Sequence, residues 1–166
     1  MFGENDFKGE EVFKTHAKRL GRELAMQYLF ECEMRGDTPS AASFDAFYEQ
    51  AAEEFELGNS STARKGRNYA EKLYISVTVN SDEIDSTIRK RTENWDLDRI
   101  GIVDRNIMRI AVAEMLYNND IPPVVSIDEA VEIARDYSGE SSGNFINGVL
   151  NGIKDTLKRS PRGSKK

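Results

Sequence analysis

The chain is 166 residues long, which suits one domain with tails. Its formal net charge is −6, from 23 basic and 29 acidic residues, and this balance argues against non-specific nucleic-acid binding through overall positive charge. The single cysteine, Cys32, excludes an internal disulfide framework and a cysteine-cluster metal site. Neither a membrane span nor a signal peptide is indicated by the apolar segments, so we expect a cytoplasmic protein without cofactors or bound metal.

Apolar residues recur at three- and four-residue steps along most of the chain, and this period predicts an all-α fold. We expect a single-domain bundle of about six to seven helices over residues 14–157. It is flanked by a flexible N-terminal tail, residues 1–13, and a basic C-terminal tail, residues 158–166. The first five helices are expected at residues 15–34, 40–57, 62–79, 82–93 and 97–118.

Two pairs of side chains have the spacing of a helix cap, in which a side-chain oxygen accepts hydrogen bonds from the first free backbone amides. Asn80 with Glu83 predicts the start of the fourth helix, and Ser126 with Glu129 predicts the start of a sixth. A turn rich in glycine and serine over residues 138–143 separates the sixth helix from the last.

The segment 97–118 is apolar on nearly all sides, which is typical of a helix at the centre of a bundle. Pro122 and Pro123 follow it closely. Because proline lacks a backbone donor and disfavours a helical conformation in the residue before it, this pair predicts an extended connection to the sixth helix.

A possible catalytic motif occurs between the last two expected helices. Gly139, Ser141 and Gly143 match the Gly-x-Ser-x-Gly pattern of a hydrolase nucleophile elbow. That motif needs a strand before the serine, whereas a helix is expected here, and it needs a histidine base, whereas His16 is the only histidine. We therefore interpret the stretch as a turn in which Ser141 or Ser142 caps the next helix, and we expect no enzyme activity.

The first helix carries a basic cluster. Residues 12–22 contain no acid and four bases, Lys14, Lys18, Arg19 and Arg22. On a helical wheel the last three point broadly away from the apolar side of this helix. Such residues can neutralise RNA phosphates, and arginine can also stack on splayed bases. The alternative interpretation is an ordinary solvated helix face.

Two stretches carry a more specific signal. The first is RLGRELAMQYLF over residues 19–30. The second, over residues 95–150, contains WDLDRI, then VDRNIMRIAVAEMLY, then IPPVVSIDEAVEIA and finally FINGVL. In this order and spacing they resemble the NusB family of bacterial transcription antitermination factors. The resemblance covers most of the expected domain but neither the acidic second helix nor the tails.

The resemblance implies an all-α protein that binds RNA. Members of the family bind the boxA element of nascent ribosomal RNA transcripts as a heterodimer with NusE, a ribosomal protein, and act on the transcription elongation complex. One alternative is a non-catalytic RNA-binding domain detached from an rRNA methyltransferase, because the same helical domain precedes the catalytic domain in some of these enzymes. Another is a protein-interaction bundle without RNA binding. A homodimer is compatible with the sequence.

The resemblance also implies site residues. The arginine-rich start of the first helix, which contacts RNA in the family, falls on Lys18, Arg19 and Arg22. The second RNA-facing region, at the start of the last helix, falls on Ser141, Asn144 and Phe145. The NusE-binding surface falls on Phe30 and Asp104, with Arg105 beside it; Asp104 suits an ion pair with a basic ribosomal protein. By the same reading Arg109, Glu114 and Asn147 hold the fold.

The sequence departs from the family at four of these places. Leu20 and Gly21 stand where Arg and Ala are usual. Fewer charges there imply fewer phosphate contacts and a shallower salt dependence, and Gly21 weakens the helix by about 1 kcal/mol relative to alanine. Ser141 and Asn144 stand where the family often has Asp and a basic residue. Backbone amides at the helix start are nevertheless expected to be able to hold a phosphate.

Overall fold

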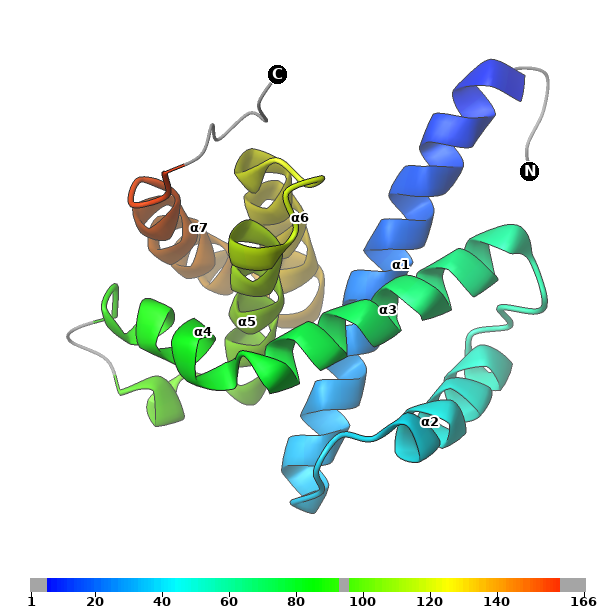
Figure 1. Ribbon diagram of the computed structural model, residues 1–166, viewed down its shortest axis with the longest axis horizontal. Helices are drawn as coiled ribbons and strands as arrows, with labels where there is room; N and C mark the ends of the chain where they lie inside the picture. The colour runs from blue at the N-terminus through cyan, green and yellow to red at the C-terminus, as the bar shows by residue number, and fades with distance from the viewer. Residues whose placement is uncertain (1–5, 93–95, 159–166) are drawn as a thin grey trace. The chain divides into compact units, whose positions relative to one another are not determined.

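The computed structural model describes residues 6–92 and 96–158, with side chains from residue 16 onward (Figure 1). Across these residues the chain forms seven α-helices and one short 3-10 helix, with no strand, which confirms the predicted all-α fold. The elements are α1 (Asp6–Arg35), α2 (Ala41–Glu54), α3 (Ser61–Val79), α4 (Ser81–Arg89), η1 (Leu97–Arg99), α5 (Ile102–Tyr117), α6 (Pro123–Ser138) and α7 (Glu140–Lys154).

Helix α1 begins at Asp6, whereas we expected its start near residue 15 and a tail over residues 1–13. Residues 6–14 contain no proline and several good helix formers, so a helix initiated further along the chain propagates through them. Its end was predicted correctly. Gly36 follows the last helical residue with φ of 72°, a left-handed conformation that glycine adopts without strain.

The chain forms two compact units, which divide between Tyr74 and Ile75 inside α3. The N-terminal unit comprises α1, α2 and most of α3, and its core contains a cluster of aromatic rings. Tyr28 of α1 lies with ring centroids 5.2 Å from Phe44 and 5.0 Å from Tyr74. The Tyr28 hydroxyl accepts a hydrogen bond from the backbone N–H of Ser40 at 2.9 Å and lies 3.1 Å from its carbonyl oxygen. Ser40 is the N-cap of α2, so the tyrosine fixes the start of α2 against α1.

Helices α1 and α3 approach closely at two glycines. A Cβ atom added to Gly21 would lie 2.9 Å from Cβ of Tyr69 and 3.0 Å from the carbonyl oxygen of Gly66. A Cβ added to Gly66 would lie 2.7 Å from Cδ2 of Leu20 and 3.2 Å from the carbonyl oxygen of Ala17. Because the two backbones meet where both side chains are missing, Gly21 has a packing role that its low helix propensity does not reveal.

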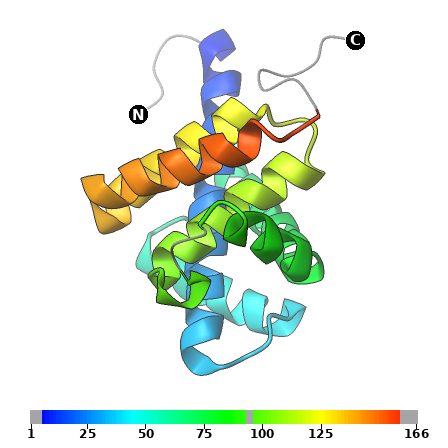
Figure 2. The same cartoon turned by 90° about the vertical axis from the view of Figure 1, so that its left-hand side faces the viewer.

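The C-terminal unit is built around α5, which packs against α4, α6 and α7. Its buried residues run from Asn106 to Met115, as expected for the central helix. Helices α6 and α7 lie side by side (Figures 1 and 2) and are joined by a single residue, Gly139, at φ 107°. The expected helix 97–118 is divided into η1 and α5. Gly101, with ψ of 145°, separates the two and is the N-cap of α5.

Two expected helix starts were wrong, and a third, at Asn80, was placed correctly but lacks its expected capping bond. Asn80 makes no capping bond; its side-chain amide donates back to the Ser76 carbonyl at 2.9 Å. The sixth helix begins at Pro123 rather than at Ser126, because proline at the first helical position has a preset φ and lacks a donor that would be unpaired there anyway. The expected turn at 138–143 is only Gly139, so Ser141 and Ser142 lie inside the first turn of α7.

Candidate RNA interface and partner surface

The basic cluster of α1 is only partly accessible. Lys18 and Arg19 are half-buried, and the Nε atom of Arg19 lies 3.9 Å from Glu23. Arg22 is 3% exposed, and its guanidinium lies 5.8 Å from the ring centroid of Tyr69. The expectation that Arg22 points to solvent is therefore wrong, because α3 covers this side of α1 where Gly21 lets it approach. The helix backbone includes Lys14, whose side chain lies outside the described residues.

The sequence reading missed bases at the start of α3. Gly66, which faces Leu20 of α1, is flanked by Arg64, Lys65 and Arg67. Arg64 and Lys65 are exposed, whereas the guanidinium of Arg67 contacts Asp45 and lies over the rings of Phe44 and Tyr48. The run of bases at residues 64–67 is visible in the sequence. Its position next to α1 is not, because it depends on the close approach of Gly21 and Gly66. The N-terminal unit thus presents bases from two adjoining helices.

The start of α7 carries the second set of expected RNA-binding residues. Ser141 and Asn144 are exposed and Phe145 is half-buried, all within two turns. Glu140 lies in the first turn, with its carboxylate 3.3 Å from Arg135 Nε, and Ser142 donates to the carboxylate of Asp104 at 2.8 Å. Two carboxylates at a helix N-terminus complement its positive end. They also repel a phosphate at the same backbone amides, which argues against the anion site expected there.

The Ser142–Asp104 hydrogen bond joins the start of α7 to the start of α5. It therefore brings an expected partner-binding residue next to the expected RNA-binding residues of α7. The second carboxylate oxygen of Asp104, Oδ1, is buried and has no hydrogen-bond partner among the described residues. Phe30, which was also expected to bind the partner, is half-buried on α1 of the N-terminal unit.

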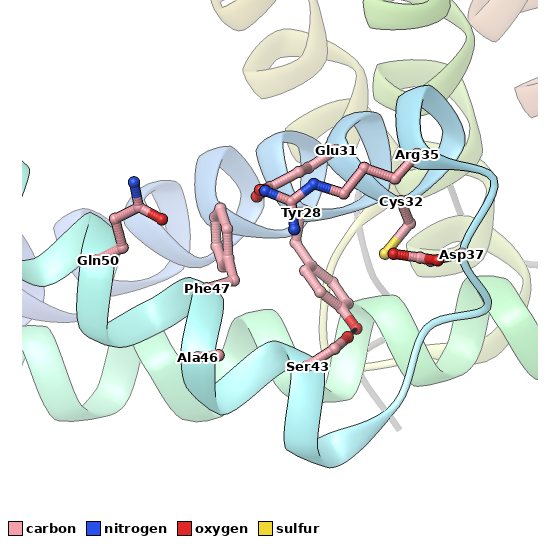
Figure 3. Close-up of a pocket in the computed structure, with 9 residues that line it drawn as sticks. All are labelled: Tyr28, Glu31, Cys32, Arg35, Asp37, Ser43, Ala46, Phe47 and Gln50. Atoms are coloured by element: carbon pink, nitrogen blue, oxygen red, sulfur yellow. Dashed lines mark hydrogen bonds and ion pairs between the residues drawn. The ribbon is translucent and has the colours of Figure 1, made fainter.

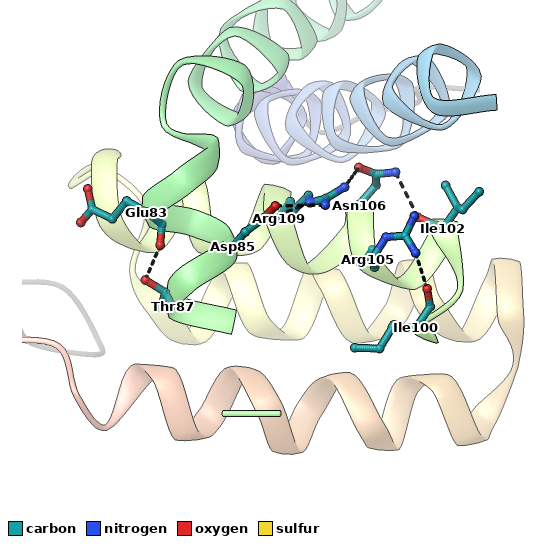
Figure 4. Close-up of polar contacts among 8 residues, drawn as sticks. All are labelled: Glu83, Asp85, Thr87, Ile100, Ile102, Arg105, Asn106 and Arg109. Carbon is teal, nitrogen blue, oxygen red and sulfur yellow. Dashed lines mark hydrogen bonds and ion pairs between the residues drawn. The ribbon is translucent and has the colours of Figure 1, made fainter. Parts of the chain in front are cut away.

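Arg105 has a structural role. Its Nη1 atom donates to the carbonyl oxygen of Ile100 at 2.7 Å (Figure 4). It also donates to that of Asp98 at 3.2 Å, and the two bonds fix η1 to the start of α5. One turn further, Arg109 makes two hydrogen bonds to the Asp85 carboxylate, at 2.8 and 3.1 Å. This two-bond geometry ties α4 to α5 and suits Arg109's expected role in holding the fold.

A small hollow opens between α1 and α2 in the N-terminal unit (Figure 3). Its empty volume is about 450 Å³, including open solvent, and the rings of Tyr28 and Phe47 line it together with Cys32. Burial raises the pKa of the Cys32 thiol, so the thiol stays protonated at neutral pH and is a poor nucleophile. Among the described residues no group of three or more metal-binding side chains occurs.

Comparison with known proteins identifies relatives that match most of this chain. The profile of the NusB family matches residues 19–155. A transcription antitermination protein NusB from Chloroherpeton thalassium is 39% identical over 86% of this chain, which spans 63% of that relative's length. NusB from Bacillus mycoides is also 39% identical, over 84% of this chain and 98% of the relative.

A solved structure shows the same fold in a complex. It contains the antitermination factors NusB and NusE with double-stranded RNA, and the matching chain has a TM-score of 0.70 and 28% identity. The match covers 85% of this chain and 98% of that chain. Among the described helices, none combines the length and the apolar character that a membrane span requires.

Proposed function

The chain belongs to the NusB family, and we propose that it is a transcription antitermination factor that binds boxA-type RNA of ribosomal RNA transcripts together with NusE. The proposal includes action in the transcription elongation complex, in the cytoplasm. The observation that carries it is the match to NusB of Bacillus mycoides over 98% of that relative's length, combined with a fold shared with a NusB chain solved with NusE and RNA.

The described surface supports RNA contacts by α1 through Lys18 and Arg19. Both lie in the middle of α1, whose neighbour α3 adds the exposed bases Arg64 and Lys65. A duplex or single strand presents a dense row of phosphates, which such bases neutralise with release of counterions. Arg22 is buried beneath this surface, with its guanidinium over the ring of Tyr69, and has a packing role.

Asp104 supports the partner contact. Its position is fixed by the hydrogen bond from Ser142, and the residue is half-buried, so the accessible part of its carboxylate can pair with a lysine or arginine of a basic ribosomal protein. A charge pair of this kind raises the association rate and the specificity more than the affinity. The hydrogen bond also links the expected partner residue on α5 to the start of α7.

The test is fluorescence anisotropy of a labelled boxA-like RNA, titrated with the chain at two salt concentrations, with and without NusE. Wild-type protein should bind RNA, bind more tightly with NusE and weaken with salt. Arg19→Glu should reduce RNA affinity at least tenfold. Arg35→Glu is the matched control: it makes the same change of charge on an exposed side chain at the C-terminal end of α1 and should leave binding unchanged.

A second variant separates the two ligands. Asp104→Asn removes the charge but keeps the shape, so it should weaken NusE binding and leave RNA binding without NusE intact. The burial of Arg22 favours one alternative, a bundle that binds a protein partner but no RNA. Binding of NusE without RNA binding at either salt concentration would establish that alternative and refute the proposal. RNA binding without any NusE binding would instead favour a detached methyltransferase domain.

A further inference from the structure

Three consecutive bases stand at the C-terminal end of α4 and have no role in the sites described above. Arg89, Lys90 and Arg91 all have exposed side chains. Among the described residues, none of the three has a carboxylate within ion-pairing distance; Glu93, the next acid in the sequence, lies outside those residues. The negative end of the helix dipole accounts for one base in a last turn. It does not require three in a row.

The C-terminal part of α7 lies against this run. A Cβ atom added to Gly152 would lie 3.2 Å from Cδ and 3.5 Å from Nε of Arg91. Because glycine has no side chain, the aliphatic part of Arg91 can rest on α7 while its charged end remains at the surface. The same end of α7 carries Lys154, and the exposed Lys158 follows shortly after the helix.

The ends of α4 and α7 meet where Arg91 contacts Gly152, and we call the bases of these two ends the α4–α7 basic surface: Arg89, Lys90, Arg91, Lys154 and Lys158. Within the described part of the chain, the ion pair made by this surface is that of Lys154 with the exposed Asp155, at 4.0 Å. The surface is thus positive on a chain whose net charge is −6. Since exposed charges are screened beyond about 8 Å at physiological salt, this local cluster decides what binds here. The sequence after Lys158 adds four more bases and no acid.

We propose that the α4–α7 basic surface is a second RNA contact, which binds phosphates of RNA that extends beyond the boxA-type element. The inference rests on the proposed function and adds a surface to it. Lysines neutralise phosphates as point charges and arginines bind them through two parallel hydrogen bonds. None of the five residues is aromatic, so the surface lacks a stacking platform for bases. It therefore increases affinity and salt dependence without adding sequence preference.

The experiment compares two RNAs, a short boxA-like RNA and the same element extended by about 12 nucleotides on each side. The variant is Arg89→Glu/Lys90→Glu, which spares the packed Arg91. The control is Arg35→Glu/Lys72→Glu, two exposed bases of the N-terminal unit with the same total change of charge. Circular dichroism melting should show that both variants remain folded.

Wild-type protein should bind the long RNA more tightly than the short one and with a steeper salt dependence. The α4 variant should lower the affinity for the long RNA about tenfold and reduce the slope of log K against log salt by about 1.4, the value for two contacts to single-stranded RNA. Its affinity for the short RNA should not change. The control should show neither effect.

Several outcomes would overturn the inference. An unchanged salt slope on the long RNA, or an equal loss on both RNAs, would show that the surface makes no contact of its own. Retained RNA affinity with lost binding of polyglutamate would assign the surface to acidic protein segments instead. If the short RNA binds but the long RNA gains nothing, this inference alone fails. If wild-type protein binds neither RNA, the proposed function fails with it.

Discussion

Replacing Gly21 by alanine tests whether α1 and α3 depend on their close contact. In a helix interior alanine is favoured over glycine by about 1 kcal/mol, so propensity alone predicts stabilisation. The new Cβ, however, would lie 2.9 Å from both Cβ and Cδ2 of Tyr69 and 3.0 Å from the carbonyl oxygen of Gly66. Neither a Cβ atom nor a backbone oxygen can move away by side-chain rotation, so the helices must separate. Overpacking of this kind costs about 1–3 kcal/mol, which leaves a net loss of about 1 kcal/mol.

Gly148→Ala is the matched control. Gly148 lies in α7, is exposed, and has nothing within 4 Å of an added Cβ. Alanine there should raise the free energy of unfolding by about 1 kcal/mol. The two substitutions should therefore differ by about 2 kcal/mol and have opposite signs. Urea denaturation followed by circular dichroism measures both. Equal stabilisation by the two substitutions would refute the close approach of α1 and α3.

Two further predictions concern the C-terminal unit. Partial burial, and secondly the hydrogen bond to the Glu83 carboxylate, raise the pKa of Tyr117 to about 12. The protonated phenol should therefore stabilise the fold fully below about pH 10, and this contribution should be lost as the pH rises through about 12. An absorbance titration of the phenolate should show this, with Glu83→Gln lowering the pKa; an unchanged pKa in that variant would contradict the account. The Ser126 hydroxyl is buried without a partner among the described residues, so Ser126→Ala should be neutral or stabilising by up to about 1 kcal/mol in thermal unfolding. A loss of about 1 kcal/mol would instead support the helix cap predicted from the sequence.

The fold was predictable because its helices are long and strongly periodic. Segment 97–118, for example, was correctly assigned to the centre of a bundle from its apolar residues alone, and α5 is buried from Asn106 to Met115 except at the half-buried Arg109. Helix starts failed where two local signals competed. At α6 the cap at Ser126 and the proline at Pro123 both have the chemistry of a helix start, and the proline prevails because its restricted φ costs nothing in a first turn.

The candidate sites were harder to predict because exposure depends on neighbours that are distant in sequence. A helical wheel predicts a solvent-facing Arg22, because it represents α1 alone and contains no neighbouring helix. The ring that covers Arg22 belongs to Tyr69, and it comes near only because Gly21 and Gly66 lack side chains. The α4–α7 basic surface escaped notice for the same reason: the contact of Arg91 with Gly152 joins segments far apart in the chain.

Leu20 and Gly21 both depart from the family pattern, and the structure relates both departures to Gly66. The Cδ2 atom of Leu20 would lie 2.7 Å from a Cβ at position 66, so the larger side chain on α1 is accommodated by the missing one on α3. Gly66→Ala should therefore be destabilising alone, but less so in combination with Leu20→Ala, which removes the crowded methyl groups. We expect a favourable coupling energy of about 1 kcal/mol in a double-mutant cycle measured by urea denaturation. Strictly additive effects would show that Leu20 and Gly66 do not share a packing site, and the departure at position 20 would then be a simple loss of an RNA-binding charge.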